Sequence, residues 1–454
     1  MKILNPANET VVAELNPDTR ESIAAKVKEL KKGQQSWAVK SLAERLNIID
    51  KFGQLVIEKK DDLARILTSE TGKPINQSYN EINGALGRID HLKSNATKWL
   101  SPESITSDEE TRELITFDPL GVICNISAWN FPYNVGFNVF LYALVAGNAV
   151  CYKPSEYASL TGLKFQELLL EAGVPADVFH CVIGGGDVGQ LLLEIDFDGY
   201  FFTGSHRTGM HIAQAVATKL VPVQLELGGK DPLYVMDDVA DISLAVANAA
   251  EGAYYNNGQS CCAVERIYVH EAIYDEFVSA FVAEVSAYRI GDPLDNDTFI
   301  GPLTRSDQRA LLLDQIEDAK RKGAHVLLGG KAMEQSGYYF EPTVISEVNH
   351  TMKVMTDESF GPIIGIQKVA SDDEAVELMA DTEYGLTAAV FSQDETRARK
   401  VLDRLNVGTA YWNCCDRVSP NLPWSGRKNS GLGSTLSYMG IRAFVQPKGY
   451  HLRG

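Results

Sequence analysis

The sequence predicts an α/β fold with a Rossmann-like parallel-sheet domain and a second α/β domain. Between Gly121 and Leu227, short apolar runs typical of buried strands alternate with helical patterns. Such alternation is the signature of right-handed βαβ crossovers in a parallel sheet. A second alternating block runs from about Pro232 to Ala410. At 454 residues the chain exceeds what one hydrophobic core usually supports, so we expect two or three domains.

The N-terminal part is predicted to be helical. From Asp18 to about Asn95, apolar side chains recur at spacings of three and four residues, the period of a helix with one buried face. Asp18 and Ser41 are the predicted N-caps, because their side-chain oxygens can accept a hydrogen bond from the first helical turn. This rhythm ends near Leu100, and residues 113–117 predict a short strand or hairpin.

Five strands separated by four helices are predicted in the first alternating block. The strands are expected at 121–126, 149–152, 178–183, 199–202 and 222–227, and the helices at 135–146, 160–172, 188–195 and 209–217. Ligands bind such sheets at the carboxyl ends of the strands. In the second block, helices are expected near 241–256, 273–287, 305–321 and 394–405, and residues 440–445 predict a closing strand.

Composition narrows the class of protein. The formal net charge of -18 argues against a surface that binds nucleic acid or an anionic membrane. No apolar run approaches the length of a transmembrane helix, and the N-terminus lacks the pattern of a signal peptide. The seven cysteines show no disulfide-like spacing, which favours reduced thiols and a cytoplasmic protein. No metal-ligand spacing is present, so we expect no metal site.

One cysteine stands at a predicted turn between a helix and a strand. Cys261 follows Gly258-Gln259-Ser260 and precedes a strand pattern at 266–270. Because Gly258 permits backbone geometry that a residue with a Cβ resists, the turn can present a sulfur atom to a cleft. The alternative is that Cys261 and Cys262 are two buried thiols, the commoner fate of cysteine.

Three turns are candidates for binding a nucleotide. Residues 184–189 match the G-x-G-x-x-G pattern and include Gly186, but they follow the third strand and equally suit a plain loop. Residues 202–209 are the better candidate, because backbone N–H groups at a helix start can hold a phosphate together with the Ser205 hydroxyl. Residues 153–156 end the second strand, where Lys153 and Glu156 either bind ribose hydroxyls or form a solvated loop.

Seven short motifs, in this order, resemble those of the NAD(P)-dependent aldehyde dehydrogenase superfamily. They are Ala128-Trp129-Asn130-Phe131-Pro132, Lys153-Pro154-Ser155-Glu156, Phe202-Thr203-Gly204-Ser205, Glu226-Leu227-Gly228-Gly229-Lys230, Gly258-Gln259-Ser260-Cys261, Glu358-Ser359-Phe360-Gly361-Pro362 and Pro423-Trp424-Ser425-Gly426-Arg427-Lys428. The resemblance implies a cofactor-binding domain (1–100 and 120–226), a catalytic domain (227–431) and a small β oligomerisation arm (101–119 and 436–454). It also implies a homodimer or homotetramer, because an exposed terminal strand is a template for pairing.

The resemblance assigns the catalytic roles to three residues. Cys261 is the nucleophile that attacks an aldehyde to form a thiohemiacetal and then a thioester. The Asn130 side chain and the Cys261 backbone N–H form the oxyanion hole, in which each donor is typically worth about 3 kcal/mol. Glu226 is the general base that activates water, and its apolar surroundings are expected to raise its pKa.

The resemblance also implies a cofactor site and a substrate tunnel. The expected cofactor is NAD, with NADP as the alternative, because Glu156 would repel a 2′-phosphate. The cofactor residues are Trp129, Lys153, Ser155, Glu156, Gly186, Gly204, Ser205, Leu227, Glu358 and Phe360. The tunnel residues are Phe131, Asn138, Tyr255, Ser260, Cys262, Val418 and Trp424.

The identity of the aldehyde is left open by these motifs. Succinate semialdehyde dehydrogenases tend to carry arginines where this chain has Asn138 and Tyr255, so a dedicated carboxylate clamp is doubtful unless Arg417 replaces it. The mixture of aromatic and polar residues suits a small neutral, aromatic or hydroxylated aldehyde, with succinate semialdehyde or a similar semialdehyde as the alternative.

The three residues with assigned catalytic roles also argue against two other functions. A reductase that acylates coenzyme A or uses phosphate would lack Glu226, and a catalytically silent binding protein would have lost Cys261, Glu226 or Asn130; all three are present. Esterase activity is a plausible side reaction of the same thiol. Adjacent Cys261 and Cys262 also raise the hypothesis of a reversible vicinal disulfide.

Overall fold

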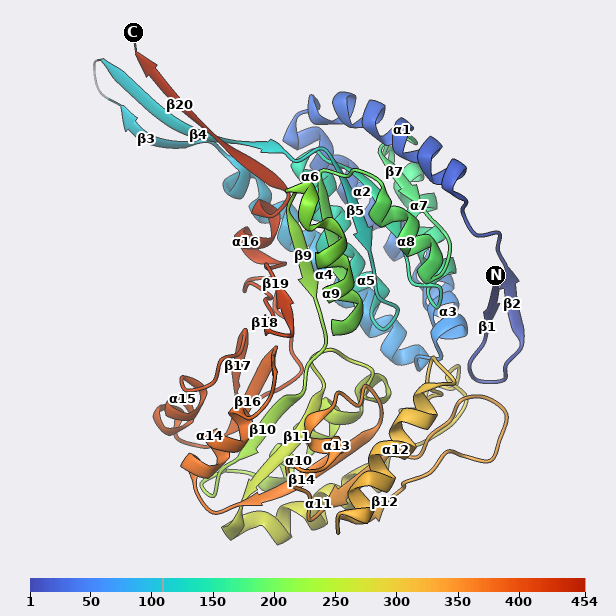
Figure 1. Ribbon diagram of the computed structural model, residues 1–454, viewed down its shortest axis with the longest axis vertical. Coiled ribbons are helices and arrows are strands. Elements are labelled where there is room, and N and C mark those ends of the chain that lie inside the picture. The colour runs from blue at the N-terminus through green and yellow to red at the C-terminus, as the bar shows by residue number, and fades with distance from the viewer. Residues whose placement is uncertain (108–109, 454) are drawn as a thin grey trace.

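The computed structural model describes residues 1–107 and 110–453, which form two α/β bodies and a projecting arm (Figure 1). The first body begins with a small hairpin of β1 (Lys2–Leu4) and β2 (Val11–Glu14), which the sequence did not predict. Four helices follow, as expected: α1 (Arg20–Ala38), α2 (Leu42–Glu58), α3 (Lys60–Thr71) and α4 (Ile75–Leu100).

Of the two predicted N-caps, Ser41 and Asp18, only one is found in the structure. Ser41 caps α2 as predicted, and its side chain and that of Glu44 form a reciprocal capping box. The prediction for Asp18 is wrong, because the N-cap of α1 is Thr19. The Asp18 carboxylate instead accepts hydrogen bonds from Lys26 Nζ at 2.7 Å and from the Ile183 backbone N–H at 2.8 Å, so it ties α1 to the first sheet.

The first sheet contains the five predicted parallel strands. They are β5 (Val122–Ile126), β6 (Ala149–Lys153), β7 (Phe179–Cys181), β8 (Gly199–Thr203) and β9 (Val223–Glu226). A short antiparallel strand, β19 (Gly431–Leu432), extends the sheet at β9, so the order is β19-β9-β8-β5-β6-β7. The connecting elements are α5 (Pro132–Gly136), η1 (Phe137–Leu141), α6 (Tyr142–Ala146), α7 (Ser159–Ala172), α8 (Gly186–Glu194), α9 (His206–Val216) and η2 (Ala217–Lys219). The strand order reverses at β5 and β8, so the loops that follow them flank a topological switch point, where ligands bind in such folds.

The second body is built on a seven-stranded sheet of order β12-β13-β14-β11-β10-β16-β17. Its strands are β10 (Asp231–Val235), β11 (Val264–His270), β12 (His325–Leu328), β13 (Thr343–Ser346), β14 (Ile363–Val369), β16 (Thr387–Phe391) and β17 (Thr409–Trp412). Its helices are α10 (Ile242–Tyr254), η3 (Tyr255–Gly258), η4 (Glu271–Ile273), α11 (Tyr274–Ser286), α12 (Gln308–Arg321), α13 (Lys353–Thr356), α14 (Asp372–Ala380) and α15 (Glu395–Leu402). The four helices expected from the sequence are α10, α11, α12 and α15.

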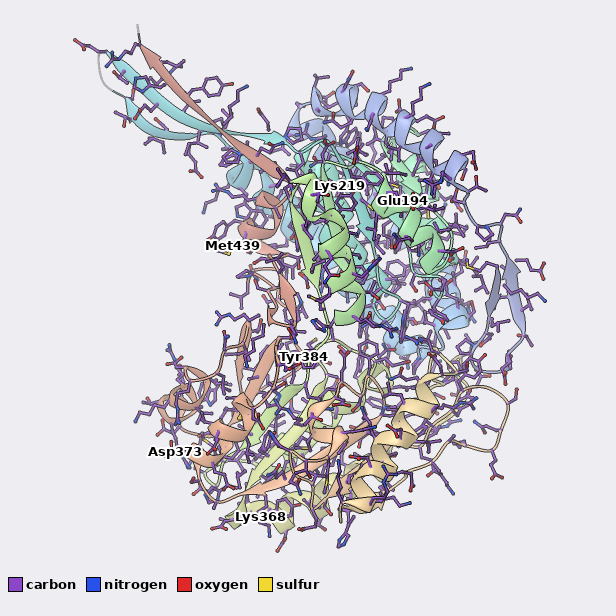
Figure 2. The ribbon with its side chains drawn as sticks, viewed as in Figure 1. Glu194, Lys219, Lys368, Asp373, Tyr384 and Met439 are labelled. Atoms are coloured by element: carbon purple, nitrogen blue, oxygen red, sulfur yellow. The ribbon has the colours of Figure 1, made fainter. Side chains whose placement is uncertain are left out.

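The C-terminal segment returns from the second body to the first. Short strand β15 (Tyr384–Gly385) pairs with β18 (Arg427–Lys428), and β19 (Gly431–Leu432) then pairs with the end of β9. Tyr384 accordingly lies where the two bodies meet, whereas Lys219 lies on the first body and Lys368 on the second, away from that junction (Figure 2). This return path places chain from beyond residue 420 beside Glu226.

The arm is a three-stranded antiparallel sheet that projects from the first body (Figure 1). It consists of β3 (Glu103–Ser107), β4 (Thr111–Pro119) and β20 (Val445–Arg453), with β4 in the centre. The strand predicted at 440–445 is wrong, because α16 (Ser437–Arg442) occupies the first half of that range and β20 begins only at Val445. Periodicity misled here, because a short apolar run fits a buried helical turn as well as a strand. Over the described residues, no helix is long and apolar enough to cross a membrane.

Candidate active site

Two cavities meet at the predicted nucleophile. One, here called the tunnel, has a volume of about 410 Å³ and lies between α4, η1, α10 and the 415–424 segment. The other, here called the cleft, has a volume of about 450 Å³ and lies along the carboxyl ends of β5, β6, β8 and β9. Cys261, Glu226 and Thr203 line both cavities. A sulfur atom and a carboxyl group therefore stand at the junction of two separate binding spaces.

The turn that carries Cys261 is built from left-handed backbone. Gly258 has φ +67°, and a Cβ there would lie 2.4 Å from the Gly361 carbonyl oxygen, so the predicted need for glycine is confirmed. Asn256 and Asn257 also adopt positive φ, at 52° and 57°. Asparagine tolerates this region because its side chain bonds locally. The chain thereby turns sharply at the end of α10, and Cys261 is left partly exposed.

Side-chain amides fix this turn to the rest of the second body. Asn257 exchanges hydrogen bonds with Gly301, donating to its carbonyl at 2.7 Å and accepting from its N–H at 3.1 Å. The Gln259 side chain donates to the Asn256 carbonyl and accepts from the Thr304 N–H. The buried amides thus replace the backbone bonds that the turn lacks. The sequence analysis missed the roles of Asn256 and Asn257.

Asn130 is tied to the cysteine turn across the two bodies. Its Nδ2 donates to the Gln259 carbonyl oxygen at 3.1 Å, and its second amide hydrogen has no acceptor among the described residues. Asn256 Nδ2 donates to the Asn130 carbonyl at 3.2 Å. Asn130 is buried and lines the cleft. The amide and the Cys261 turn are therefore held together by reciprocal contacts.

Lys73 contacts the loop that carries Asn130, a role that was not predicted from the sequence. Its ammonium forms a buried ion pair with Glu81, donates to the Asn130 carbonyl at 2.6 Å and lies 3.8 Å from the centroid of the Phe131 ring. Burial lowers the pKa of Lys73, while Glu81 opposes that shift. A lysine in the middle of a buried contact network is a positioning group for the loop. The sequence offers no local signal that Lys73 and Asn130 meet.

Glu226 ends β9 in an apolar environment. Burial raises its pKa to about 7, and hydrogen bonds with Thr435 and Gln224 oppose that rise. The Thr435 hydroxyl donates to Oε1 at 2.8 Å. The expectation that the surroundings raise the pKa of Glu226 is confirmed. Thr435 comes from the returning C-terminal segment, which no nearby sequence pattern connects with Glu226.

Cys262, Ser260 and Asp416 form a second polar cluster beside the nucleophile. The Cys262 sulfur donates to Asp416 Oδ1 at 3.0 Å, and the Ser260 hydroxyl donates to the same oxygen at 3.4 Å. A hydrogen bond with Cys261 and then burial raise the pKa of Cys262 well above its usual value. Burial also raises the pKa of Asp416 to about 7. Cys262 therefore keeps its proton near neutral pH. Asp416 lines the tunnel and was not predicted from the sequence.

The cleft brings together every residue predicted to bind the cofactor. The ten residues Trp129, Lys153, Ser155, Glu156, Gly186, Gly204, Ser205, Leu227, Glu358 and Phe360 all line it. Both glycine-rich turns border the same cavity, so neither candidate is isolated from it. Ser205 is the N-cap of α9 and accepts from the Thr208 N–H at 3.4 Å. Arg305 and Gln308 also line the cleft and were not predicted.

Glu358 is packed on a glycine. A Cβ on Gly228 would lie 2.0 Å from Glu358 Oε1, and that oxygen accepts from the Gly229 N–H at 3.1 Å. Burial raises the pKa of Glu358 to about 7. Behind it, the buried Lys230–Glu265 ion pair, at 2.6 Å, anchors the loop, because Glu265 accepts from the backbone N–H groups of residues 359 and 360. The carboxyl group is thereby aimed into the cleft.

Two rings form one wall of the cleft. Trp129 and Phe360 meet edge to face, with ring centroids 5.6 Å apart. Phe360 has φ +47°, which is rare for a bulky residue and turns its ring toward Trp129. Lys153 is buried close by, and its ammonium donates to the Pro154 carbonyl at 3.2 Å. Its remaining hydrogens are available to a ligand.

All seven predicted tunnel residues line the tunnel: Phe131, Asn138, Tyr255, Ser260, Cys262, Val418 and Trp424. The sequence analysis missed Arg88, Glu251 and Asp416, whose ionisable groups share this space. Arg88 had a signal, because it is a charged residue within the apolar stripe of α4 that includes Ala85, Ile89 and Leu92. Within residues 1–107 and 110–453, no cluster of three or more metal-ligating side chains is found.

Known proteins resemble this chain over nearly its whole length. The model of the aldehyde dehydrogenase family matches residues 1–449. The chain is similar to the chloroplastic betaine aldehyde dehydrogenase of Beta vulgaris, at 34% identity over 459 residues, covering 98% of this chain and 91% of the relative. It is also similar to the structure of a Staphylococcus aureus betaine aldehyde dehydrogenase in complex with NAD+ (31% identity, TM-score 0.95, 99% and 91% coverage). A 3,6-anhydro-L-galactose dehydrogenase in complex with NAP matches at 32% identity, with a TM-score of 0.95 and coverage of 100% and 96%.

Proposed function

Because the chain belongs to the aldehyde dehydrogenase family, we propose that it oxidises an aldehyde to the carboxylic acid through a thioester on Cys261. The observation that carries this proposal is the position of Cys261 and Glu226 at the junction of the tunnel and the cleft. An aldehyde in the tunnel and a cofactor in the cleft would then meet at the sulfur atom.

The residues of the cleft fit a nicotinamide dinucleotide. Glycines at 186 and 204 border the space, buried Lys153 has unused donors, and Glu358 presents a carboxylate to ribose hydroxyls. Trp129 and Phe360 supply an aromatic wall. When bound, NAD(P)+ supplies a hydride acceptor. NAD is the proposed cofactor, because Glu156 would repel the 2′-phosphate of NADP.

In the acylation half, Cys261 attacks the aldehyde carbon, and the oxygen becomes negatively charged. The free Asn130 Nδ2 hydrogen and the Cys261 backbone N–H are placed to donate to that oxygen. The thiolate is the reactive form, and an ordinary cysteine, with a pKa of ~8.5, is only slightly ionised at neutral pH. The Cys262 thiol keeps its proton, so Cys261 is the proposed nucleophile of the pair.

In the hydrolytic half, Glu226 takes a proton from water that attacks the thioester. A pKa of about 7 suits this role, because the carboxyl group is both substantially ionised and basic near neutral pH. The acid then leaves, and the Cys261 sulfur is regenerated. Glu226 also argues against coenzyme A as the acceptor, because water activation needs such a base.

The two bodies divide this work. Residues 1–100 and 120–226 of the first body are the proposed cofactor-binding domain, and residues 227–431 are the proposed catalytic domain. Residues 101–119 and 436–454 are proposed to mediate a homodimer or homotetramer through the arm. The seven free cysteines suit a compartment that keeps thiols reduced, so we assign the protein to the cytoplasm.

A panel of aldehydes assayed with NAD and NADP in parallel, by absorbance of the reduced cofactor, tests this function. The expected result is reduction of NAD at a rate that depends on the aldehyde and exceeds the rate with NADP. No cofactor reduction with any aldehyde would refute the oxidative function, whereas faster reduction of NADP would refute only the role given to Glu156.

A further inference from the structure

A buried arginine reaches the tunnel from α4. Arg88 is 6% exposed and lines the same cavity as Cys261. Its Nε donates to Asn138 Oδ1 at 2.9 Å, and its Nη1 donates to the Gly84 carbonyl at 3.0 Å. Two of its five N–H groups are thus used for neutral acceptors. Within the described part of the chain, Arg88 forms no ion pair.

Every carboxyl group that lines the tunnel has its own partner. Glu81 is paired with Lys73, and Glu251 with Arg417 at 3.8 Å. Asp416 accepts from Cys262 and Ser260, and Glu226 accepts from Thr435. Burial lowers the pKa of Arg88 to about 10, so its guanidinium remains charged at neutral pH. The charge of Glu81 opposes that shift, but among the described residues no carboxylate forms a direct ion pair with this buried cation.

Further polar groups converge on the same corner. An atom placed as Cβ on Gly84 would lie 3.4 Å from Arg88 Nη1 and 3.6 Å from Asn134 Oδ1. Asn134 Oδ1 is buried, with no hydrogen-bond partner among the described residues. Asn138 accepts through Oδ1, and its Nδ2 donates no hydrogen bond to the described part of the protein. The unused N–H donors of Arg88 and Asn138 indicate a place for a ligand group that accepts hydrogen bonds, whereas Asn134 Oδ1 would need a donor.

We propose that the tunnel binds an aldehyde with a carboxylate at the end remote from the carbonyl, and that Arg88 pairs with that carboxylate. This proposal rests on the proposed aldehyde oxidation. A carboxylate can accept two N–H bonds from one guanidinium, so it would satisfy the donors that Arg88 leaves free. Asn138 and Tyr255 stand where succinate semialdehyde dehydrogenases tend to carry arginines. Arg88, on another helix, donates to the Asn138 side chain and so supplies a guanidinium at this place in the tunnel.

The same charge disfavours a cationic aldehyde. A quaternary or primary ammonium group beside the buried guanidinium of Arg88 would be repelled by its charge. Betaine aldehyde, the substrate named for the Beta vulgaris relative, carries such a group. This chain is therefore expected to prefer anionic aldehydes, whereas the substrate named for that relative is cationic. Asp416 is the group that would favour a cation instead.

Matched aldehydes of four to six carbons test the proposal. For each length, kcat/KM is measured for the ω-carboxylate, the unsubstituted alkanal and the ω-amino aldehyde, with succinate semialdehyde, butanal and 4-aminobutanal as the shortest set. In the native protein the anionic member at one length is expected to exceed its neutral partner by at least about tenfold, the worth of a charged hydrogen bond. A higher value for every neutral or amino member would overturn the proposal without any variant.

Variants then locate the charge. Arg88→Met is expected to lower the anionic-to-neutral ratio at least about tenfold, and Arg88→Lys is expected to restore part of it. Arg417→Met is the competing variant, because Arg417 is the other arginine of the tunnel and its side chain is 61% exposed. A ratio that falls with Arg417→Met but not with Arg88→Met would assign the carboxylate to Arg417 and overturn the proposal. Absence of cofactor reduction with all members would instead refute the aldehyde oxidation itself.

Discussion

At the scale of single residues, the proposed reaction assigns acylation to Cys261 and hydrolysis to Glu226. Cys261→Ala removes the proposed nucleophile, so we expect aldehyde oxidation to fall at least about 10³-fold. Cofactor affinity, measured by fluorescence titration, should stay within about threefold of the native value. Cys414→Ala is the matched control, because Cys414 is partly exposed and lines neither cavity. Retained oxidation in Cys261→Ala would move the nucleophile to another thiol.

The raised pKa of Glu226 predicts how turnover depends on pH. The base works only when it has lost its proton, so turnover limited by thioester hydrolysis should rise with pH and reach half its maximum near pH 7. Glu226→Gln should remove this rise and slow turnover by about 10²- to 10⁴-fold. A rapid first burst of reduced cofactor should remain, because the burst precedes the hydrolytic step in which Glu226 is proposed to act.

The measurement is stopped-flow absorbance from pH 5.5 to 9. Asp416 and Glu358 also have pKa values of about 7, so the variant is essential for assigning the titration. If the rise near pH 7 persists in Glu226→Gln, one of those two carboxyl groups controls turnover instead. Unchanged turnover together with weakened cofactor binding would contradict the role of Glu226 as a base.

At the scale of elements, the cysteine turn depends on a single glycine. Gly258→Ala forces a side chain into left-handed backbone and toward the Gly361 carbonyl, so we expect a loss of unfolding free energy of about 2 kcal/mol or more. Activity should fall with it, because the turn positions Cys261. Chemical denaturation and kcat/KM give the two readouts.

Gly87→Ala is the control for that substitution. Gly87 lies in α4 with nothing within 4 Å of its added Cβ, and alanine favours a helix interior over glycine by about 0.5–1 kcal/mol. This variant should therefore be more stable than the native protein and equally active. Equal stability changes in both variants would mean that the turn tolerates a side chain at position 258.

How far the sequence predicts these elements depends on whether the signal is local. The five strands of the first sheet were predictable because each is a short apolar run between turn residues, and Gly258 was predictable because its neighbours mark a sharp turn. Lys73, Thr435 and Asp416 were not, since each reaches the site from a segment far along the chain. Arg88 could be singled out as a charged residue within the apolar stripe of α4. Its contact with Asn138 could not be predicted, because Asn138 lies on another element.

At the scale of the whole molecule, the arm has two unpaired edges. In the order β20-β4-β3, the outer sides of β20 and β3 have no neighbouring strand within the described chain. Tyr450, Leu452 and Ile105 are exposed apolar side chains on these strands, at 37%, 38% and 58%. An edge strand with exposed apolar residues is a template for pairing with another chain. The arm therefore supports the proposed homodimer or homotetramer.

Charges on the arm should disrupt that assembly. In Tyr450→Glu/Leu452→Glu, two apolar contacts are replaced by carboxylates on the edge strand, a substitution that natural sheets use against pairing. Sedimentation velocity is expected to show the native protein as a dimer or tetramer and the double variant as a smaller species. The pairing of β20 with β4 spans nine residues, so the arm itself should still fold.

Leu220→Glu is the matched control, because Leu220 is an exposed apolar residue, at 93%, on the turn after α9. It removes a comparable apolar side chain away from the arm, so its assembly should equal that of the native protein. If Leu220→Glu dissociates and the arm variant does not, the subunits associate through the first body. Assembly that resists both substitutions would likewise exclude the arm edge, because a carboxylate buried between paired strands without a cation is strongly disfavoured.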